Sequence, residues 1–130
     1  MTHEGLIKFY QEEADRQLGE GVVQVDFIAD EDVKPHETYV QGFFDVYWFE
    51  NGYDAPILLE IISYCDADIE DSELELLDNE ASITVNHELI HLQQYNEGRF
   101  IEDWNGSYDD NPNEIEAYAN EGKGTFKIER

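Results

Sequence analysis

The sequence predicts an α+β fold, in which a small antiparallel sheet of three or more strands packs beside an active-site helix and a C-terminal glutamate helix. Apolar residues recur at helical spacing in three segments, at 5–18, 77–96 and 113–121. Segments typical of β-strands lie between the first two of these, at 22–28, 39–49 and 58–64. The Asn51-Gly52 pair before the last strand is a strong hairpin signal, so we expect antiparallel pairing.

The first helix is expected over residues 5–18. Its apolar positions recur at spacings of one, three and four: Leu6, Ile7, Tyr10, Ala14 and Leu18. Gly19 and Gly21 end this helix. Residues 22–28 then alternate apolar and polar side chains, which predicts a strand.

The middle of the chain predicts a hairpin. Residues 39–49 are aromatic and β-branched and are expected to form one long strand, and residues 58–64 form the returning strand. Residues 65–75 are expected to be an acidic connection to the second helix, which ends at Gly98. Pro112 suits the first turn of the third helix, and residues 125–128 are expected to be a short strand or a tail.

Length and composition indicate one folded domain. The chain has 130 residues, of which 41% are hydrophobic and 13% aromatic. A core of ordinary size is therefore expected despite the charge. We expect residues 1–130 to form a single domain.

The charge of the chain excludes several classes of partner. Only 7 Lys and Arg residues stand against 32 Asp and Glu, and the formal net charge is −25. Nucleic-acid binding requires Lys and Arg to replace phosphate counterions, and anionic membranes repel such a chain. We expect neither nucleic acid nor a membrane as a partner.

Sequence features also predict the location of the protein. Cys65 is the only cysteine, which fits a reducing compartment. The first residues carry Glu4 where a signal peptide is basic, and no apolar run has the length of a membrane span. We expect a cytoplasmic protein without a signal peptide or transmembrane segment.

The clearest motif is His87-Glu88-Leu89-Ile90-His91. Histidines four residues apart on a helix lie one turn apart on the same face, so both imidazoles can bind one small cation. Glu88 projects beside them, where it can hold a metal-bound water and accept its proton. A metal lowers the pKa of such a water and polarises a carbonyl group. The motif therefore predicts a site for one divalent metal ion, zinc by default.

A catalytic zinc site needs a third protein ligand and an open position. The other histidines, His3 and His36, lie far upstream, and none follows His91. A downstream carboxylate is therefore expected to complete the site, and the best segment, 111–120, contains Glu114 and Glu116. These two residues point about 200° apart on a helix, so only one of them can be a ligand.

Two segments and one tyrosine between them carry a family resemblance. They are His87-Glu-Leu-Ile-His91-Leu-Gln-Gln94, Tyr108, and Pro112-Asn-Glu114-Ile-Glu116-Ala117-Tyr118. Over residues 80–121 the sequence resembles the gluzincin clan of zinc metallopeptidases. It is similar above all to the small single-domain minigluzincins and to peptidases of bacteriophage genomes. If the chain is viral, its location is the cytoplasm of the host.

The resemblance implies a zincin-like fold and assigns roles to individual residues. His87, His91 and Glu114 would bind Zn²⁺, and Glu88 would be the general base. Glu114 is preferred because the first Glu of a Glu-x-Glu-Ala segment usually ligates in related zincins. Glu116 stays the alternative, with Asn120 as the residue that orients a histidine in that case. Tyr118 stands where the clan usually has Asp.

The resemblance also implies a peptide or protein substrate. Tyr108 is our candidate for the donor that stabilises the oxyanion, ahead of Tyr118, Tyr95, His3 and His36. If strand 39–49 lies at a sheet edge, an extended substrate is expected to pair with it. The sequence thus favours a small zinc-dependent metallopeptidase. The alternative is an acidic binding or DNA-mimic inhibitor protein, in which the metal site is structural and no catalysis occurs.

Overall fold

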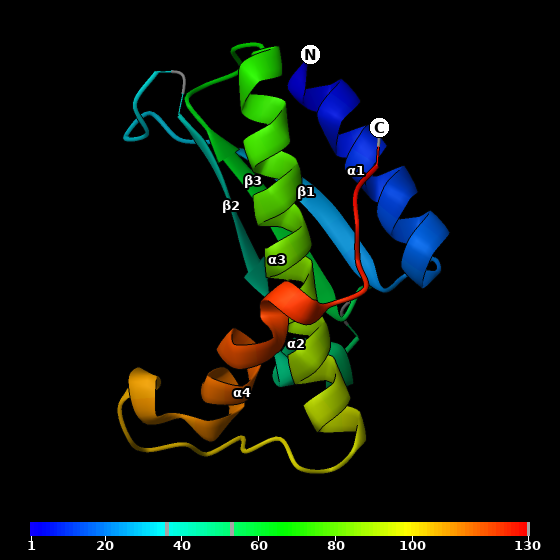
Figure 1. The fold of residues 1–130 in the computed structure, drawn as a ribbon, viewed down its shortest axis with the longest axis vertical. Coiled ribbons are helices and arrows are strands. Elements are labelled where there is room, and N and C mark those ends of the chain that lie inside the picture. The colour runs from blue at the N-terminus through cyan, green and yellow to red at the C-terminus, as the bar shows by residue number, and fades with distance from the viewer. Residues whose placement is uncertain (36, 53, 130) are drawn as a thin grey trace.

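The structure, a computed structural model, describes residues 1–35, 37–52 and 54–129. The elements in this part of the chain are α1 His3–Leu18, β1 Val23–Ala29, β2 Thr38–Phe43, α2 Val46–Glu50, β3 Ile57–Ser63, α3 Asp71–Asn96, η1 Tyr108–Asp110, α4 Pro112–Asn120 and η2 Glu121–Lys123. The long helix α3 lies across one face of the sheet with α1 beside it, and α2 and α4 lie near the C-terminal end of α3 (Figure 1). The predicted α+β class is confirmed.

The sheet is mixed, with the strand order β1-β3-β2. β2 and β3 are antiparallel, as predicted, but β1 runs parallel to β3, with Val23 opposite Ile57. The prediction of a wholly antiparallel sheet was therefore wrong for β1. The connection between β1 and β2 spans residues 30–37 and is long enough to cross one strand position, a distance of about 10 Å. The most apolar strand, β3, fills the central position.

The prediction of one long strand over residues 39–49 is wrong for the residues after Phe43. β2 ends at Phe43, and α2 begins at Val46. The Asp45 side chain accepts hydrogen bonds from the backbone N–H groups of Tyr47 and Trp48, at 2.9 and 3.4 Å. This cap stabilises a helical turn and outweighs the β-propensity of the aromatic residues. The Asn51-Gly52 turn consequently follows a helix and does not join two strands directly.

Two helices begin earlier than predicted. α1 begins at His3 because the Thr2 hydroxyl accepts the Gly5 N–H. α3 begins at Asp71, within the predicted acidic connection, and its 26 residues give a length of about 39 Å. Residues 125–128 form no strand, but the Phe126 side chain packs into the core.

The core lies between the helices and one face of the sheet. Residues 71–85 of α3 contribute Leu77, Ala81 and Val85, all at most 1% exposed. They cluster with the side chains of α1, β1 and β3: Leu6, Tyr10, Ala14, Val23, Val25, Ile57, Leu59 and Ile61. After Val85, the buried residues of α3 are polar: Asn86, His87, Glu88, His91 and Gln94. Among the described residues, no helix has the length and apolar character needed to cross a membrane.

Gly42 packs directly against α3. A Cβ atom at this position would lie 2.6 Å from Cγ2 of Thr84 and 3.0 Å from Cγ of Glu88. A larger residue therefore requires the Thr84 side chain or the strand itself to shift. The small size of Gly42 therefore lets β2 pack beside the His87–His91 segment.

We expect Gly42→Ala to destabilise the protein by about 1–3 kcal/mol, because the added methyl overpacks the contact with Thr84. Urea denaturation measures this change. Gly122→Ala is the matched control, since a Cβ atom there meets no other atom within 4 Å. Equal stability of the Gly42 and Gly122 variants would contradict the close contact.

Candidate metal centre

The C-terminal half of α3 carries the motif histidines on one face, as its spacing predicts. His87, Glu88 and His91 are all buried, and their potential ligand atoms lie within 4.8 Å of one another. The two imidazole rings are 4.8 Å apart and nearly perpendicular. The helix therefore brings two nitrogen donors and one carboxylate to a single point.

Glu114, on α4, contacts both histidines. Its Oε2 lies 2.9 Å from Nε2 of His87, and its Oε1 lies 2.8 Å from Nε2 of His91. The Asn111 side chain caps α4 through the N–H of Asn113, and Pro112 stands in the first turn as predicted. One carboxylate thus bridges both imidazoles, opposite α3.

Glu116 lies in a different environment. Its Oε2 is 2.6 Å from Nη1 of Arg99, and its Oε1 accepts a hydrogen bond from the Gln94 amide at 3.3 Å. The hydrogen bond from Arg99 is the main reason that the pKa of Glu116 is below its usual value. The structure therefore brings Glu114, and not Glu116, to the two histidines. The identity of the third ligand stays a prediction.

The Nδ1 atom of each histidine also contacts an oxygen acceptor. Nδ1 of His87 lies 2.8 Å from Oε2 of Glu121, and Nδ1 of His91 lies 2.9 Å from Oε1 of Gln94. The Gln94 amide is itself fixed, because its nitrogen donates to the Asn113 carbonyl at 3.0 Å. In the tautomer that carries the proton on Nδ1, His87 donates to Glu121 and His91 donates to Gln94. Both Nε2 atoms then present lone pairs to Glu114.

Glu121 and Gln94 were not predicted as site residues. Gln94 left one signal in the sequence, because it follows His91 by three residues on the same face of the helix. Glu121 left none, since it follows the last turn of α4 and belongs to no motif. Only the packing of η2 against α3 brings it to His87.

The arrangement fits a bound cation. In the tautomer with both Nδ1–H groups engaged, the lone pairs of His87 and His91 face the carboxylate oxygens of Glu114, which are acceptors too. Acceptors at 2.8 and 2.9 Å need a shared proton or a metal ion between them. Two imidazoles and one carboxylate are a ligand set that binds zinc in catalytic sites.

Glu88 has the properties of a general base. Burial raises the pKa of its carboxyl to about 7, and the nearby Glu114 also raises it, whereas His87 and the Phe44 N–H oppose the shift. A carboxyl with this pKa exchanges protons readily near neutral pH. Glu88 also stands among the residues that could hold a metal ion, beside His87 and His91.

Tyr108 and Tyr118 lie over the histidines. The Tyr108 hydroxyl donates to Oε2 of Glu114 at 2.8 Å and lies 2.8 Å from the Tyr118 hydroxyl. Burial is the main cause that raises the pKa of Tyr108, so its hydroxyl stays protonated as a donor. The Tyr118 ring packs against His87 with a centroid distance of 4.6 Å. Both hydroxyl groups are therefore candidate oxyanion donors.

The other predicted donors lie elsewhere. The Tyr95 hydroxyl is hydrogen-bonded to Glu50, and His3 stacks on Phe27 with a centroid distance of 3.8 Å. His36 lies outside the described residues. Of the predicted donors that the structure describes, Tyr108 and Tyr118 are the two that lie beside Glu114.

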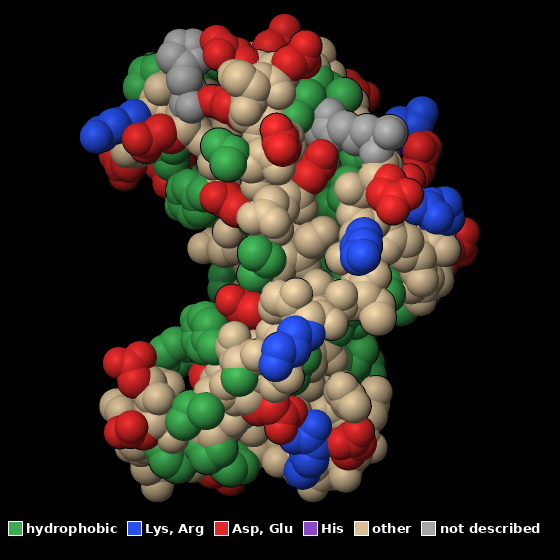
Figure 2. All heavy atoms as spheres, in the orientation of Figure 1, with side chains coloured by type: hydrophobic (Ala, Val, Ile, Leu, Met, Phe, Trp, Pro, Cys, Tyr) green, Lys and Arg blue, Asp and Glu red, His purple; other side chains and the backbone are tan. Residues whose placement is uncertain are grey.

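A pocket of about 310 Å³ opens onto the site between β2, α3 and α4. His87, Glu88, Tyr108, Tyr118 and Glu121 line it, together with Gln41 and Gly42 from β2. The molecule narrows between the part that holds the sheet and the part that holds α4 (Figures 1 and 2). β2 is an edge strand, so one row of its backbone groups has no strand partner among the strands of the described residues.

Comparison with protein-family models, with curated proteins and with solved structures found no match.

Proposed function

We propose that this protein is a small zinc-dependent metallopeptidase. The observation that carries the proposal is the position of the Glu114 carboxylate, which bridges Nε2 of His87 and Nε2 of His91. Both histidines are fixed through Nδ1, as metal-binding histidines usually are. The buried Glu88 beside them, with its raised pKa, supports hydrolysis as the reaction.

In the proposed mechanism, His87, His91 and Glu114 would hold a zinc ion, which would supply Lewis-acid chemistry by lowering the pKa of a water molecule and polarising the substrate carbonyl. Glu88 accepts the proton of the attacking water and returns it to the leaving amine. Tyr108 or Tyr118 donates a hydrogen bond to the carbonyl oxygen as negative charge develops there. The free edge of β2 aligns an extended peptide beside the pocket.

The proposal includes the family and the cellular location. The two-His, one-Glu arrangement on α3 and α4 supports membership of the gluzincin clan, close to the minigluzincins. The substrate is a peptide or protein. We place the activity in a cytoplasm, because the single cysteine, Cys65, fits a reducing compartment.

The proposal is tested by metal content and activity together. We expect about one zinc ion per chain after dialysis, measured by atomic emission, because three ligands converge at one point. Hydrolysis of a peptide library is expected to stop on chelation and to return with added zinc. A protein without stoichiometric zinc would overturn the proposal and favour the acidic binding protein. Zinc without hydrolysis would leave only a structural metal.

The contact between Glu121 and His87 gives a further prediction. Glu121→Ala removes the acceptor at Nδ1 of His87, and we expect it to weaken zinc binding by about 10- to 100-fold. Glu121→Gln retains an acceptor oxygen and is expected to lose less. Competition with a zinc-binding dye measures the affinity. Glu129→Ala, which removes an exposed carboxylate, controls for charge, and equal losses in both alanine variants would refute the orienting role.

A further inference from the structure

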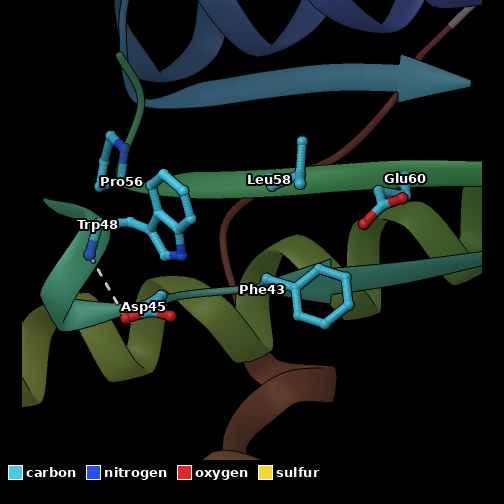
Figure 3. A pocket seen from close by; sticks show the side chains of 6 residues that line it. All are labelled: Phe43, Asp45, Trp48, Pro56, Leu58 and Glu60. Carbon is cyan, nitrogen blue, oxygen red and sulfur yellow. Dashed lines mark hydrogen bonds between the residues drawn. The ribbon is translucent and has the colours of Figure 1, made fainter. Parts of the chain in front are cut away.

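A second pocket lies on the face of the sheet opposite α3 (Figure 3). Its volume is about 310 Å³, and it is lined by Phe43, Asp45, Trp48, Pro56, Leu58 and Glu60. We call it the sheet pocket. None of these residues lines the pocket at the candidate metal centre.

Side-chain alternation explains why this face of the sheet is open. Gly42 faces α3, where its neighbours are Thr84 and Glu88, so the next residue, Phe43, faces the opposite side. Leu58 is the partner of Phe43 across the β2–β3 pair and shares that side. The helices α1 and α3 bury the other face in the core.

The sheet pocket exposes large apolar side chains. Phe43 is 46% exposed and Trp48 is 54% exposed. The capping of α2 by Asp45 fixes the helical turn that carries Trp48, and its indole ring lies beside Pro56 at the end of the sheet (Figure 3). Exposed aromatic residues around a hollow are typical of a protein-binding surface, in which they anchor the partner.

The rim of the sheet pocket is acidic. Glu60 and Asp45 line it, and Asp26 is the register partner of Glu60 across β1 and β3. Burial and the charge of Asp26 raise the pKa of Glu60. Among the residues that the structure describes, no Lys or Arg lines the pocket. A positive charge brought by a partner would relieve the repulsion between these carboxylates.

We propose that the sheet pocket binds a segment of a partner protein that presents apolar side chains flanked by Lys or Arg. The apolar side chains contact Trp48, Phe43 and Leu58, and the cation pairs with Glu60. A second copy of this chain is disfavoured as the occupant, because two molecules with a net charge of −25 repel each other. The proposal does not depend on the metal centre.

Binding of short peptides tests the proposal. The probe is acetyl-Lys-Leu-Leu-Lys-amide, and its controls replace either both leucines by glycine or both lysines by glutamate. Calorimetry at 0.15 M salt limits binding due to overall charge, because the screening length is then about 8 Å. We expect the probe to bind at least tenfold more tightly than either control peptide.

Variants assign the binding to the sheet pocket. Trp48→Ala is expected to weaken binding of the probe at least tenfold, and Glu60→Gln about threefold. Ile115→Ala and Glu129→Gln, at exposed positions outside the pocket, are expected to leave it unchanged. Trp48→Phe, which keeps an aromatic ring, is expected to retain most of the binding. Circular dichroism checks that each variant is folded.

Three results would overturn the proposal. The first is equal binding of the glycine control peptide, which would show attraction by charge alone. The second is unchanged binding by folded Trp48→Ala. The third is a dimer, detected by sedimentation, that Trp48→Ala dissociates, because a second copy would then occupy the pocket. Chelation of metal is expected to leave peptide binding unchanged. Failure of the proposed peptidase activity would therefore not overturn the proposal for the sheet pocket.

Discussion

Glu88→Gln is expected to retain zinc and to lose peptide hydrolysis by about 10²- to 10⁴-fold, the usual contribution of a general base. The amide has nearly the shape of the carboxylate but does not accept a proton. Glu88 is buried and its pKa is raised to about 7, so a neutral side chain at this position is tolerated in the fold. We therefore expect the stability of the variant to equal or exceed that of the wild type.

The measurements are zinc content, turnover of the best library peptide, and the midpoint of urea denaturation. Glu80→Gln is the matched control, because it makes the same change at an exposed position of α3. Loss of zinc in Glu88→Gln would assign Glu88 as a ligand, since it is one of three residues whose ligand atoms cluster within 4.8 Å. Full activity with bound zinc would reject it as the base.

The sequence predicted the elements that depend on local patterns. The His87–His91 spacing placed both imidazoles on one face of α3, and Pro112 correctly marked the first turn of α4. These predictions follow from the period of a helix and from the fixed φ of proline. Local information was therefore enough for the two helices that hold the site.

Features that depend on competing or distant interactions were not predicted. The parallel pairing of β1 with β3 arises because β3 enters the sheet between β1 and β2, and no local pattern encodes that order. The aromatic segment after Phe43 has strand propensity, but the cap at Asp45 turns it into α2. Both errors concern the sheet. Because of them, the sequence did not predict the open face of the sheet or the sheet pocket on it.

The residues that orient the histidines differ in the same way. Gln94 is within one turn of His91, so helical spacing made it visible as a polar residue on the buried face. Glu121 reaches His87 from a separate 3-10 helix, 34 positions along the chain. A contact of this kind depends on how η2 packs, which the sequence pattern does not specify.

The second large effect is expected from Glu114→Gln compared with Glu116→Gln, two identical changes on one helix. We expect Glu114→Gln to weaken zinc binding by more than about 100-fold, beyond the range for residues that only orient a ligand. Glu116→Gln is expected to leave zinc binding unchanged. It removes an ion pair with Arg99 at the surface, which contributes at most about 1 kcal/mol to stability.

Zinc affinity by dye competition and stability by urea denaturation separate the two roles. Weaker zinc binding by Glu116→Gln than by Glu114→Gln would assign Glu116 as the ligand. That assignment would require a change in the structure. Positions 114 and 116 lie about 200° apart around α4, so the helix would have to rotate. Rotation would expose Asn113 and Ala117, which are now 4% and 0% exposed, and would break the hydrogen bond from Gln94 to the Asn113 carbonyl. The buried face of α4 is thus the physical reason to expect Glu114 at the metal.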